Sequence, residues 1–338
     1  PDVQTLNGEN ATRLLTQQYV GNFHPLTMYS LAISYQLFGD NPQPYFITNL
    51  LLHLLNTFLV FYFIFLLSKK RVEVAAIVAV FFGVHPMHVE SVAWLAERKD
   101  VLYTAFFMGG LITYLKYIKE QKQIQYAWTI LLFIASALSK PAALVFPLAL
   151  LCIDYYEGRI TKSSIAKIAT EKAAFFSISL LMGIWTLTTQ GQAEALREIL
   201  SFPEKIVVAC YGLCIYLANM FVPFKMSNYH PFPYPLDTLT SSAYVAAPLI
   251  VIAVAVLTFL SSKKTRVVAF GLLFYVVNLA LVLHILKTFG GAIIAERYTY
   301  VPYIGPLFVI GWFFSEIWRS KKQSMQTVRY ATLATLLV

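Results

Sequence analysis

The stretch PQPYFITNLLLHLLNTFLVFYFIFLL, from Pro42 to Leu67, decides the fold class. It is long enough to cross a bilayer as one helix, because a spanning helix needs about 20 predominantly apolar residues. Basic residues follow it at Lys69, Lys70 and Arg71. Further apolar runs, separated by short polar stretches, continue along the rest of the chain. We therefore predict an all-α, polytopic transmembrane helix bundle.

The composition of the chain also indicates a membrane protein. Of its 338 residues, 58% are hydrophobic and 13% are charged, whereas soluble domains have about 45–50% apolar and about 25% charged residues. A water-soluble globule of this composition would expose too much apolar surface. An outer-membrane β-barrel would show short strands of alternating hydrophobicity instead. Disorder and a disulfide scaffold are excluded as well.

We expect roughly 10–12 membrane segments, given the length that a spanning helix needs. Beyond Pro42–Leu67, the apolar runs are Val72–Val84, Asp100–Lys116, Tyr126–Leu138, Pro141–Tyr156, Ala173–Thr189, Lys205–Val222, Ala243–Leu260, Val267–His284, Val301–Trp318 and one that begins near Tyr330. The membrane domain thus covers residues 42–338, and residues 1–41 form a first outer loop region with interfacial helices. The runs ending at Val84 and Leu138 are short, so we expect those helices to be bent or broken.

Basic residues orient the chain, because cytoplasmic loops of membrane proteins carry an excess of Lys and Arg. One set of loops, at residues 69–71, 116–122, 159–172, 263–266 and 319–329, holds 17 of the 26 basic residues. We predict that this side is cytoplasmic and that its loops are solvated linkers. The formal net charge of +9 is therefore explained by the basic loops on the cytoplasmic side of the membrane. We expect no nucleic-acid partner.

One segment does not fit a simple alternation of loops between the cytoplasmic and the outer side of the membrane. A full crossing by Lys205–Val222 would place the basic residues 263–266 outside. We therefore expect Thr189–Val222 to form a re-entrant or interfacial pair, or to contain a second crossing. Charged residues in this part of the chain suit a helix that lies at the interface; they are Glu194, Arg197, Glu198 and Glu204.

Ionisable residues concentrate on the outer side. They lie in residues 85–90 (HPMHVE), 97–100 (ERKD), 139–141 (SKP), 229–235 (YHPFPYP) and 296–298 (ERY). Ionisable groups at membrane depth are costly and tend to be functional. We therefore expect the chemistry at the outer face. The proline-rich segment cannot be helical, and it either lines a groove or connects two spans.

Four cations stand at the outer edges of membrane segments, namely Arg98, Lys99, Lys140 and Arg297. Each alone fits a side chain that extends to the lipid headgroups. Together they suit a lipid-linked phosphate, because Arg matches phosphate oxygens in two-point contacts and Lys adds a point charge. Both interpretations remain open at this stage.

A second group lies around two histidines. His85 and His88, three residues apart and followed by Glu90, either hold a metal or belong to a structural network that anchors the loop. The ligand set is incomplete and no HExxH pattern is present, so we expect no cofactor, with a divalent metal as the alternative. The residues expected to shape the pocket are His24, His85, His88, Glu90, Glu296 and Tyr298.

Four segments carry a family resemblance. They are FHPLTMYSLAISYQLFGDNPQPYFITNLLLHLLN (Phe23–Asn56), HPMHVESVAWLAERKDVLY (His85–Tyr103), ALSKPAALVFPLALLCIDYY (Ala137–Tyr156) and AERYTYVPYIG (Ala295–Gly305). In this order they resemble the membrane domain of the transmembrane and tetratricopeptide-repeat-containing O-mannosyltransferases and their bacterial relatives. The resemblance implies a GT-C type glycosyltransferase. It also implies a polyprenyl-phosphate-linked, mannose-like sugar donor and transfer to a Ser or Thr hydroxyl of a protein on the non-cytoplasmic face.

In such a fold the catalytic acidic pair lies in the first outer loop, just after the first membrane helix. Asp2 and Glu9 are the only carboxylates before Asp40, and neither fits an Asp-Asp pattern. The catalytic residue is therefore unassigned and expected upstream of Pro1. We expect the chain to be a fragment that lacks the first membrane helix and the C-terminal repeats.

Family position and chemistry favour Arg297 and Arg98 as phosphate contacts, with Lys140 and Lys99 behind them. Two other functions stay open. A transporter or lipid flippase would account for broken helices and intramembrane polar groups, and a non-catalytic scaffold would anchor a repeat domain or a larger complex. The short loops favour a bacterial inner membrane over an endoplasmic reticulum.

Overall fold

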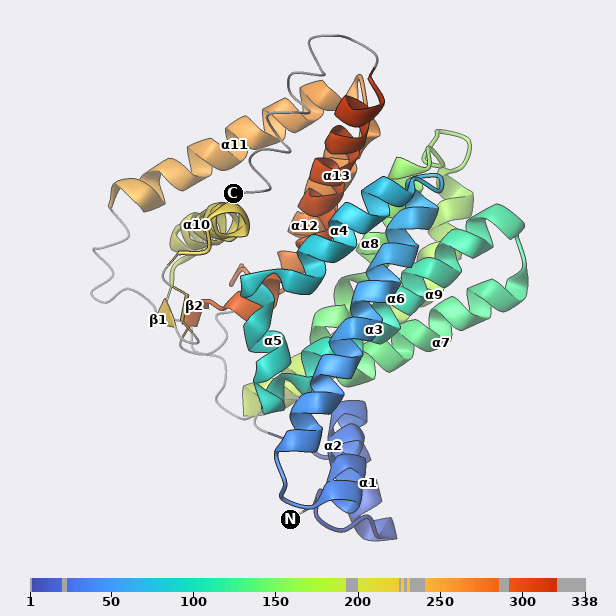
Figure 1. Ribbon diagram of the computed structural model, residues 1–338, viewed down its shortest axis with the longest axis vertical. Coiled ribbons are helices and arrows are strands. Elements are labelled where there is room, and N and C mark those ends of the chain that lie inside the picture. The colour runs from blue at the N-terminus through green and yellow to red at the C-terminus, as the bar shows by residue number, and fades with distance from the viewer. Residues whose placement is uncertain are drawn as a thin grey trace.

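The computed structural model describes residues 2–19, 23–192, 200–224, 226–227, 230–231, 241–285 and 292–320. In this part of the chain helices dominate, and the strands form a single two-stranded antiparallel sheet (Figure 1). Long apolar helices lie side by side and make up most of the molecule. The prediction of an all-α polytopic bundle is confirmed, and the chain is an integral membrane protein.

The helices follow the order of the apolar runs. They are α1 (Gly8–Thr16), α2 (Pro25–Phe38), α3 (Gln43–Leu67), α4 (Val72–Val84), α5 (Val89–Ala93), α6 (Arg98–Glu120), α7 (Gln123–Ser139), α8 (Phe146–Tyr156), α9 (Ile165–Gln192), α10 (Phe202–Phe221), α11 (Ser242–Ser262), α12 (Arg266–Leu279) and α13 (Ile304–Arg319). Short 3-10 turns are η1 (Pro86–His88), η2 (Leu95–Glu97), η3 (Pro141–Val145) and η5 (Glu296–Thr299), and the strands are β1 (His230–Pro231) and β2 (Ala292–Ile294).

Local sequence explains several helix boundaries. Pro25 occupies the first turn of α2, where its fixed φ suits a helix start and its missing N–H is not needed. Gly39 ends that helix with a φ of 60°, a conformation that glycine adopts without strain. Ser201 and Glu204 form a capping box at the start of α10, so two otherwise unpaired backbone N–H groups are satisfied.

Fewer helices reach spanning length than the sequence predicted. By length and composition, five can cross a membrane: Gln43–Leu67, Leu95–Glu120, Ile165–Thr188, Phe202–Phe221 and Ser242–Ser262. A sixth forms if α4 and the following segment to Ala93, bent by 58°, count as one span. Gln123–Ser139, Pro141–Tyr156 and Arg266–Leu279 are apolar but shorter. These counts concern the described ranges, and the run near Tyr330 lies outside them.

The two expected breaks are present. The helix that ends at Val84 is followed by Pro86, and the chain turns there by 58°. Similarly, α7 ends at Ser139, one residue after the predicted Leu138, and Pro141 follows shortly after. In both places the residue before proline is driven out of the helical region, so each helix stops where the sequence indicated.

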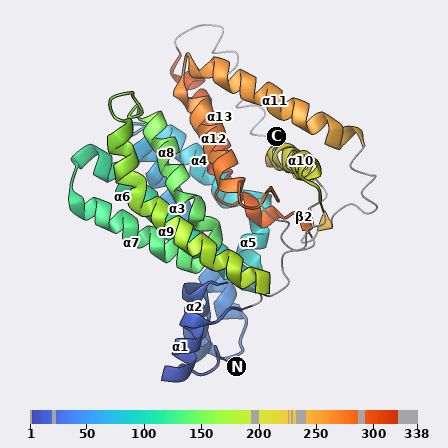
Figure 2. The same ribbon diagram turned by 180° about the vertical axis from the view of Figure 1, so that it is seen from behind.

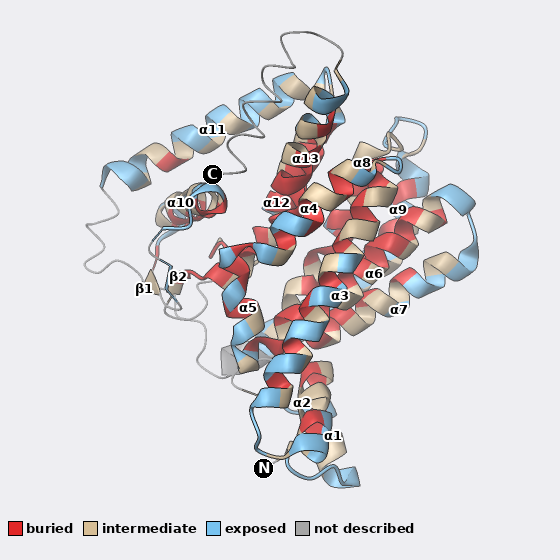
Figure 3. Cartoon of the chain, viewed as in Figure 1, coloured by how far each residue is buried: buried red, intermediate tan, exposed pale blue. Residues whose placement is uncertain are grey.

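The core lies where α3, α4, α6, α8, α12 and α13 face one another (Figure 3). Figure 2 shows from behind how α9 covers α6 and α8. By contrast, α11 has only 6% of its apolar window buried, at a mean hydropathy of 2.5. A helix so apolar and so little covered by protein suits contact with lipid. This helix therefore marks the lipid-facing side of the bundle.

The helices α12 and α13 approach closely at two glycines. A Cβ atom on Gly271 would lie 2.6 Å from the carbonyl oxygen of Gly305, which is closer than real side chains allow. Small residues of this kind let membrane helices pack backbone to backbone. The contact fixes α13, and with it the η5 turn that precedes α13, against the bundle.

We expect Gly271→Ala to lower the free energy of unfolding by about 1–3 kcal/mol, the usual cost of overpacking a tight interface. The matched control is Gly183→Ala, because a Cβ there would meet nothing closer than 3.8 Å, from Leu144. Thermal unfolding in detergent measures both. An unchanged melting temperature for Gly271→Ala would contradict this view of the contact.

The helix α2 packs against α7, and α1 packs against α2. Thr27 Oγ1 donates to the carbonyl oxygen of Ser139 at 2.9 Å, and Tyr29 OH donates to that of Ala11 at 2.6 Å. Figure 1 shows α1 and α2 together at one end of the bundle. The assignment of this region to the first outer loop stays a prediction.

The orientation of α10 differs from that of the long helices. In Figure 1 it is seen nearly end-on, while α3 and α6 run along the picture. The segment is long enough to span a membrane, but its inclination fits the interfacial alternative for Thr189–Val222. Glu204 caps its first turn. Glu194, Arg197 and Glu198 lie outside the described residues.

Loops predicted to be cytoplasmic meet at the opposite end of the bundle from α1 and α2. Arg71 pairs with Glu316, and Arg319 Nη2 lies 2.6 Å from Glu73 Oε1. These pairs join the start of α4 to the end of α13. The predicted cations Lys321, Lys322 and Arg329 lie outside the described residues.

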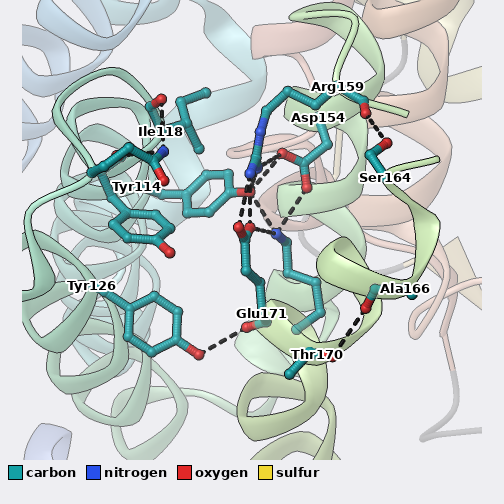
Figure 4. Close-up of polar contacts among 12 residues, drawn as sticks. Tyr114, Ile118, Tyr126, Asp154, Arg159, Ser164, Ala166, Thr170 and Glu171 are labelled. Atoms are coloured by element: carbon teal, nitrogen blue, oxygen red, sulfur yellow. Dashed lines mark hydrogen bonds and ion pairs between the residues drawn. The ribbon is translucent and has the colours of Figure 1, made fainter. Parts of the chain in front are cut away.

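Two cations of these loops are not solvated linkers, contrary to the prediction. Arg159 and Lys172 lie with Tyr114, Asp154 and Glu171 in what we name the inner cluster (Figure 4). Arg159 Nη2 donates to both carboxylate oxygens of Glu171 at 2.9 Å. Lys172 Nζ lies 2.8 Å from Asp154 Oδ2 and donates to Tyr114 OH at 2.5 Å. Two cations and two carboxylates thus neutralise each other where α6, α8 and α9 meet.

Candidate functional site

The outer segments that carry ionisable residues meet in one place. The turn η5 packs against η1 and α5, and the chain then continues through η2 into α6. The link between α7 and η3 supplies a lysine to the same region. We name the resulting group the outer cluster; its members are Glu90, Glu97, Lys99, Asp100, Lys140 and Arg297.

Arg297 joins η5 to α5 through Glu90. Its backbone N donates to Glu90 Oε2 at 2.8 Å, and its Nη1 donates to Glu90 Oε1 at 2.5 Å. The two side chains are 18% and 5% exposed. Burial by itself would lower the pKa of Arg297, but Tyr298, Glu97 and Glu90 raise it above its usual value. The guanidinium therefore stays charged.

Lys140 forms an ion pair with Asp100 at the start of α6. Asp100 also accepts a hydrogen bond from Ser91 Oγ at 3.1 Å. The Lys140 ammonium lies 5.8 Å from the centre of the Tyr298 ring and 5.7 Å from that of Tyr103. Burial would lower the pKa of Lys140, yet the carboxylates of Asp100 and Glu97 raise it, so the lysine remains protonated.

Glu97 completes the cluster. Its Oε1 lies 3.1 Å from Lys99 Nζ and 3.6 Å from Arg297 Nε. Its Oε2 is buried without a hydrogen-bond partner among the described residues. Within the outer cluster, three carboxylates therefore face three cations.

An open cleft with a volume of about 440 Å³ adjoins the cluster. Its lining residues are Val89, Glu90, Ala93, Trp94, Met226, Ser227 and Glu296. Trp94 is 47% exposed, and the Arg297 guanidinium lies 5.6 Å from the centre of its ring. The cleft thus combines a flat aromatic surface with two carboxylates, and the outer cluster forms one of its edges through Glu90.

Residues just before the proline-rich run also line the cleft. Ser227 N donates to Glu296 Oε1 at 2.5 Å, and His230 Nε2 lies 3.5 Å from the same oxygen. Met226 also lines the cleft. Tyr229 and residues 232–235 lie outside the described part of the chain, and the described residues of the run, His230 and Pro231, do not line the cleft. The choice between groove and connector therefore stays a prediction.

His85 and His88 both form hydrogen bonds with backbone groups. His85 Nε2 lies 3.0 Å from the Met220 carbonyl oxygen, and its Nδ1 accepts from Met87 N at 3.2 Å. His88 Nδ1 lies 2.8 Å from the Phe82 carbonyl oxygen. These contacts fit the structural-network interpretation. In the described ranges, no three or more His, Cys, Asp or Glu side chains gather as a metal site would require.

Of the six residues expected to shape the pocket, Glu90 and Glu296 line the cleft, whereas His24, His85, His88 and Tyr298 do not. His24 begins α2 and is not one of the lining residues. Arg98 is fully buried and donates to Asn49 Oδ1 at 2.6 Å and to the Tyr45 carbonyl oxygen at 3.1 Å. It also donates to the hydroxyls of Ser30 and Ser34. Arg98 therefore joins α6 to α2 and α3, and it does not meet the other three cations as expected.

Three of the relatives that match parts of this chain are protein O-mannosyl-transferases. Protein O-mannosyl-transferase Tmtc1 of Drosophila melanogaster is 32% identical over 124 residues, which are 37% of this chain and 14% of the relative. Protein O-mannosyl-transferase F38B6.6 of Caenorhabditis elegans is 30% identical over 154 residues, 43% of this chain and 21% of the relative. Protein O-mannosyl-transferase TMTC1 of Mus musculus is 32% identical over 93 residues, 28% of this chain and 10% of the relative.

The chain is similar to the TMTC protein O-mannosyl-transferases. The resemblance predicted from the four segments is therefore confirmed for the regions that match. No family model matches it. The matched regions span at most 21% of the three relatives.

Sequence reasoning missed Trp94 in this TMTC-like membrane domain and did not assign roles to Glu97 and Asp100. A signal for Trp94 was present, because it follows Glu90 by four residues and such residues share one helical face. Asp100 lies next to Lys99 in the sequence but pairs with Lys140. That pairing depends on how α6 and α7 pack, which spacing along the chain does not reveal.

Proposed function

We propose that this chain is the membrane domain of a glycosyltransferase. It moves a mannose-like sugar from a polyprenyl-phosphate donor to a Ser or Thr hydroxyl of an acceptor protein at the outer face. The observation that supports this proposal is the outer cluster, in which Arg297, Lys140 and Lys99 converge beside an open cleft. The similarity to protein O-mannosyl-transferases supports it independently.

The position of the cluster suits a lipid-linked donor. The isoprenoid tail of such a donor lies in the bilayer, and its phosphate lies at the interface, where these cations are. When the bond between sugar and phosphate breaks, negative charge builds on the lipid phosphate. Arg297 and Lys140 are largely buried and fixed in place by carboxylates, so they can stabilise this charge with little reorganisation.

The cleft suits the sugar and the acceptor. Trp94 offers a flat apolar face for a sugar ring, and Glu90 and Glu296 offer oxygens for its hydroxyls. The acceptor hydroxyl needs a carboxylate within hydrogen-bond reach to take its proton. Glu90 accepts a hydrogen bond from Arg297, and Glu296 accepts one from Ser227 N. We therefore propose that Glu90 and Glu296 shape the pocket. No residue of this chain is assigned as the catalytic base.

A second candidate function is a transporter or lipid flippase. The broken helix between Val84 and Val89 is the observation that favours it, because discontinuous helices form the binding sites of many transporters. The third candidate, a non-catalytic scaffold, stays open as an alternative. The placement in a bacterial inner membrane also stays a prediction; the relatives named above come from animals.

A transfer assay decides between these functions. We expect the full-length protein, reconstituted in vesicles, to move labelled mannose from polyprenyl-phosphate mannose to a Ser/Thr peptide. We also expect the same rate in the presence of EDTA, since the positive charges of Lys99, Lys140 and Arg297 are available to stabilise the phosphate. Movement of the lipid across the vesicle without mannosylated peptide would favour the transporter, and neither activity would favour the scaffold.

A further inference from the structure

The charge balance of the outer cluster conflicts with simple binding of a phosphate. Arg297 faces Glu90, Lys140 faces Asp100, and Lys99 faces Glu97. A phosphodiester brings one further negative charge. An unbalanced charge in a buried site is costly. A donor phosphate therefore binds readily only if one of the three carboxylate side chains moves out of the cluster.

Two of the carboxylates are held at both oxygens. Glu90 accepts from the backbone N and from Nη1 of Arg297. Asp100 accepts from Lys140 at one oxygen and from Ser91 at the other, and its side chain is 0% exposed. Moving either of them would break two hydrogen bonds and leave a buried group unpaired, which is expensive.

Glu97 is held less firmly. Its contacts are 3.1 Å to Lys99 Nζ and 3.6 Å to Arg297 Nε, both through Oε1. The second oxygen is buried and has no hydrogen-bond partner among the described residues. A buried carboxylate oxygen without a hydrogen-bond partner has lost its hydration and gained no bond in return. Moving the Glu97 side chain out of the cluster therefore costs less free energy than moving Glu90 or Asp100.

The position that Glu97 fills is the one best suited to a phosphate. It lies between Lys99 and Arg297, a point charge and a planar guanidinium, which is the pair of donors that phosphate oxygens prefer. Both cations are partly exposed, at 21% and 18% of their side chains. Glu97 itself lies in η2, a single 3-10 turn that begins beside the exposed Trp94, so its side chain can turn away without moving a long helix.

We propose that Glu97 is an exchangeable counter-ion. In the unliganded protein its carboxylate occupies the place of the donor phosphate between Lys99 and Arg297, and the incoming phosphodiester displaces it. This inference rests on the proposed function. It assigns Glu97 a role in setting the affinity for the anionic donor, while Glu90 and Asp100 hold the cations in position.

The test compares two carboxylate-to-amide variants of the full-length protein in phosphatidylcholine nanodiscs. The probe is polyprenyl-phosphate mannose, and the measurement is its Kd. We expect Glu97→Gln to bind about tenfold more tightly than the wild type, because an internal competitor of one charge is removed. Asp100→Asn is the matched control. It changes the net charge equally but frees Lys140 from its anchor, so we expect no gain in affinity and a lower melting temperature.

Each outcome bears on the proposal. If Glu97→Gln binds no more tightly than the wild type, or if Asp100→Asn gains affinity equally, exchange of Glu97 is wrong although the donor site stands. If no variant and no wild type binds the probe, the proposed donor and the exchange fail together. Glu97→Ala serves as a second variant if Glu97→Gln does not fold, and the same gain in affinity is expected of it.

Discussion

Replacing Arg297 with alanine is expected to lower kcat for sugar transfer by about 10²–10³-fold, the usual loss when one preorganised group that stabilises developing charge is removed. Arg297 is the cation whose guanidinium reaches both Glu90 and the edge of Glu97. Its removal takes away the fork that would face the leaving phosphate. The rate of mannose transfer to a Ser/Thr peptide, measured with saturating donor, checks the prediction.

Two controls separate catalysis from folding. Lys122→Ala removes a cation whose side chain is 64% exposed and paired with Glu120, and exposed pairs contribute little, so this variant should keep the wild-type rate. Arg297→Lys keeps the charge but not the fork, and we expect an intermediate rate. A wild-type rate in Arg297→Ala would remove Arg297 from the proposed phosphate site.

The second large effect is expected in the inner cluster. Lys172→Ala leaves Asp154 and Glu171 with Arg159 as their cation, and Asp154 is fully buried. Breaking a buried ion pair by removing one partner costs about 3–5 kcal/mol. We therefore expect a loss of this size in the free energy of unfolding, seen as a clearly lower melting temperature in detergent.

The matched control for this change is Lys167→Ala, on the same helix α9 but exposed, which should leave the melting temperature unchanged. The double variant Lys172→Met with Asp154→Asn removes one charge of each sign, and it should be more stable than Lys172→Ala alone. Equal stability of Lys172→Ala and the wild type would show that the inner cluster does not hold α6, α8 and α9 together.

The fold class and the meeting of the outer segments were predictable from the sequence. The run Pro42–Leu67 and the composition required a membrane bundle, and the separation of basic from mixed-charge loops indicated which ends would meet. The structure brings Glu90, Lys140 and Arg297 together at one such end. Such features can be predicted because they depend on which segments are buried and on which side of the membrane a loop lies. The rotation of any one helix does not change them.

The direction of individual side chains was not predictable. Arg98 and Lys99 are neighbours in the sequence, but a helix turns by about 100° at each residue, and Arg98 points into the bundle while Lys99 reaches Glu97. The inner cluster was missed for a related reason. Counting loop cations treats each charge alone, whereas Arg159 meets Glu171 only because α8 and α9 pack together.

Both clusters include residues of α6, and the spacing of these residues has a consequence for the surrounding lipid. Asp100 and Tyr114 are fourteen residues apart on α6, so at the helical rise per residue they are separated by about 21 Å. The hydrocarbon layer of a typical bilayer is about 30 Å thick. Polar groups that lie closer together than this thickness are accommodated by local thinning of the bilayer or by lying below the headgroups. Each cluster is neutral overall, so it can lie below the headgroups or in a locally thinned bilayer. A thinned leaflet would bring a lipid-linked sugar closer to its acceptor.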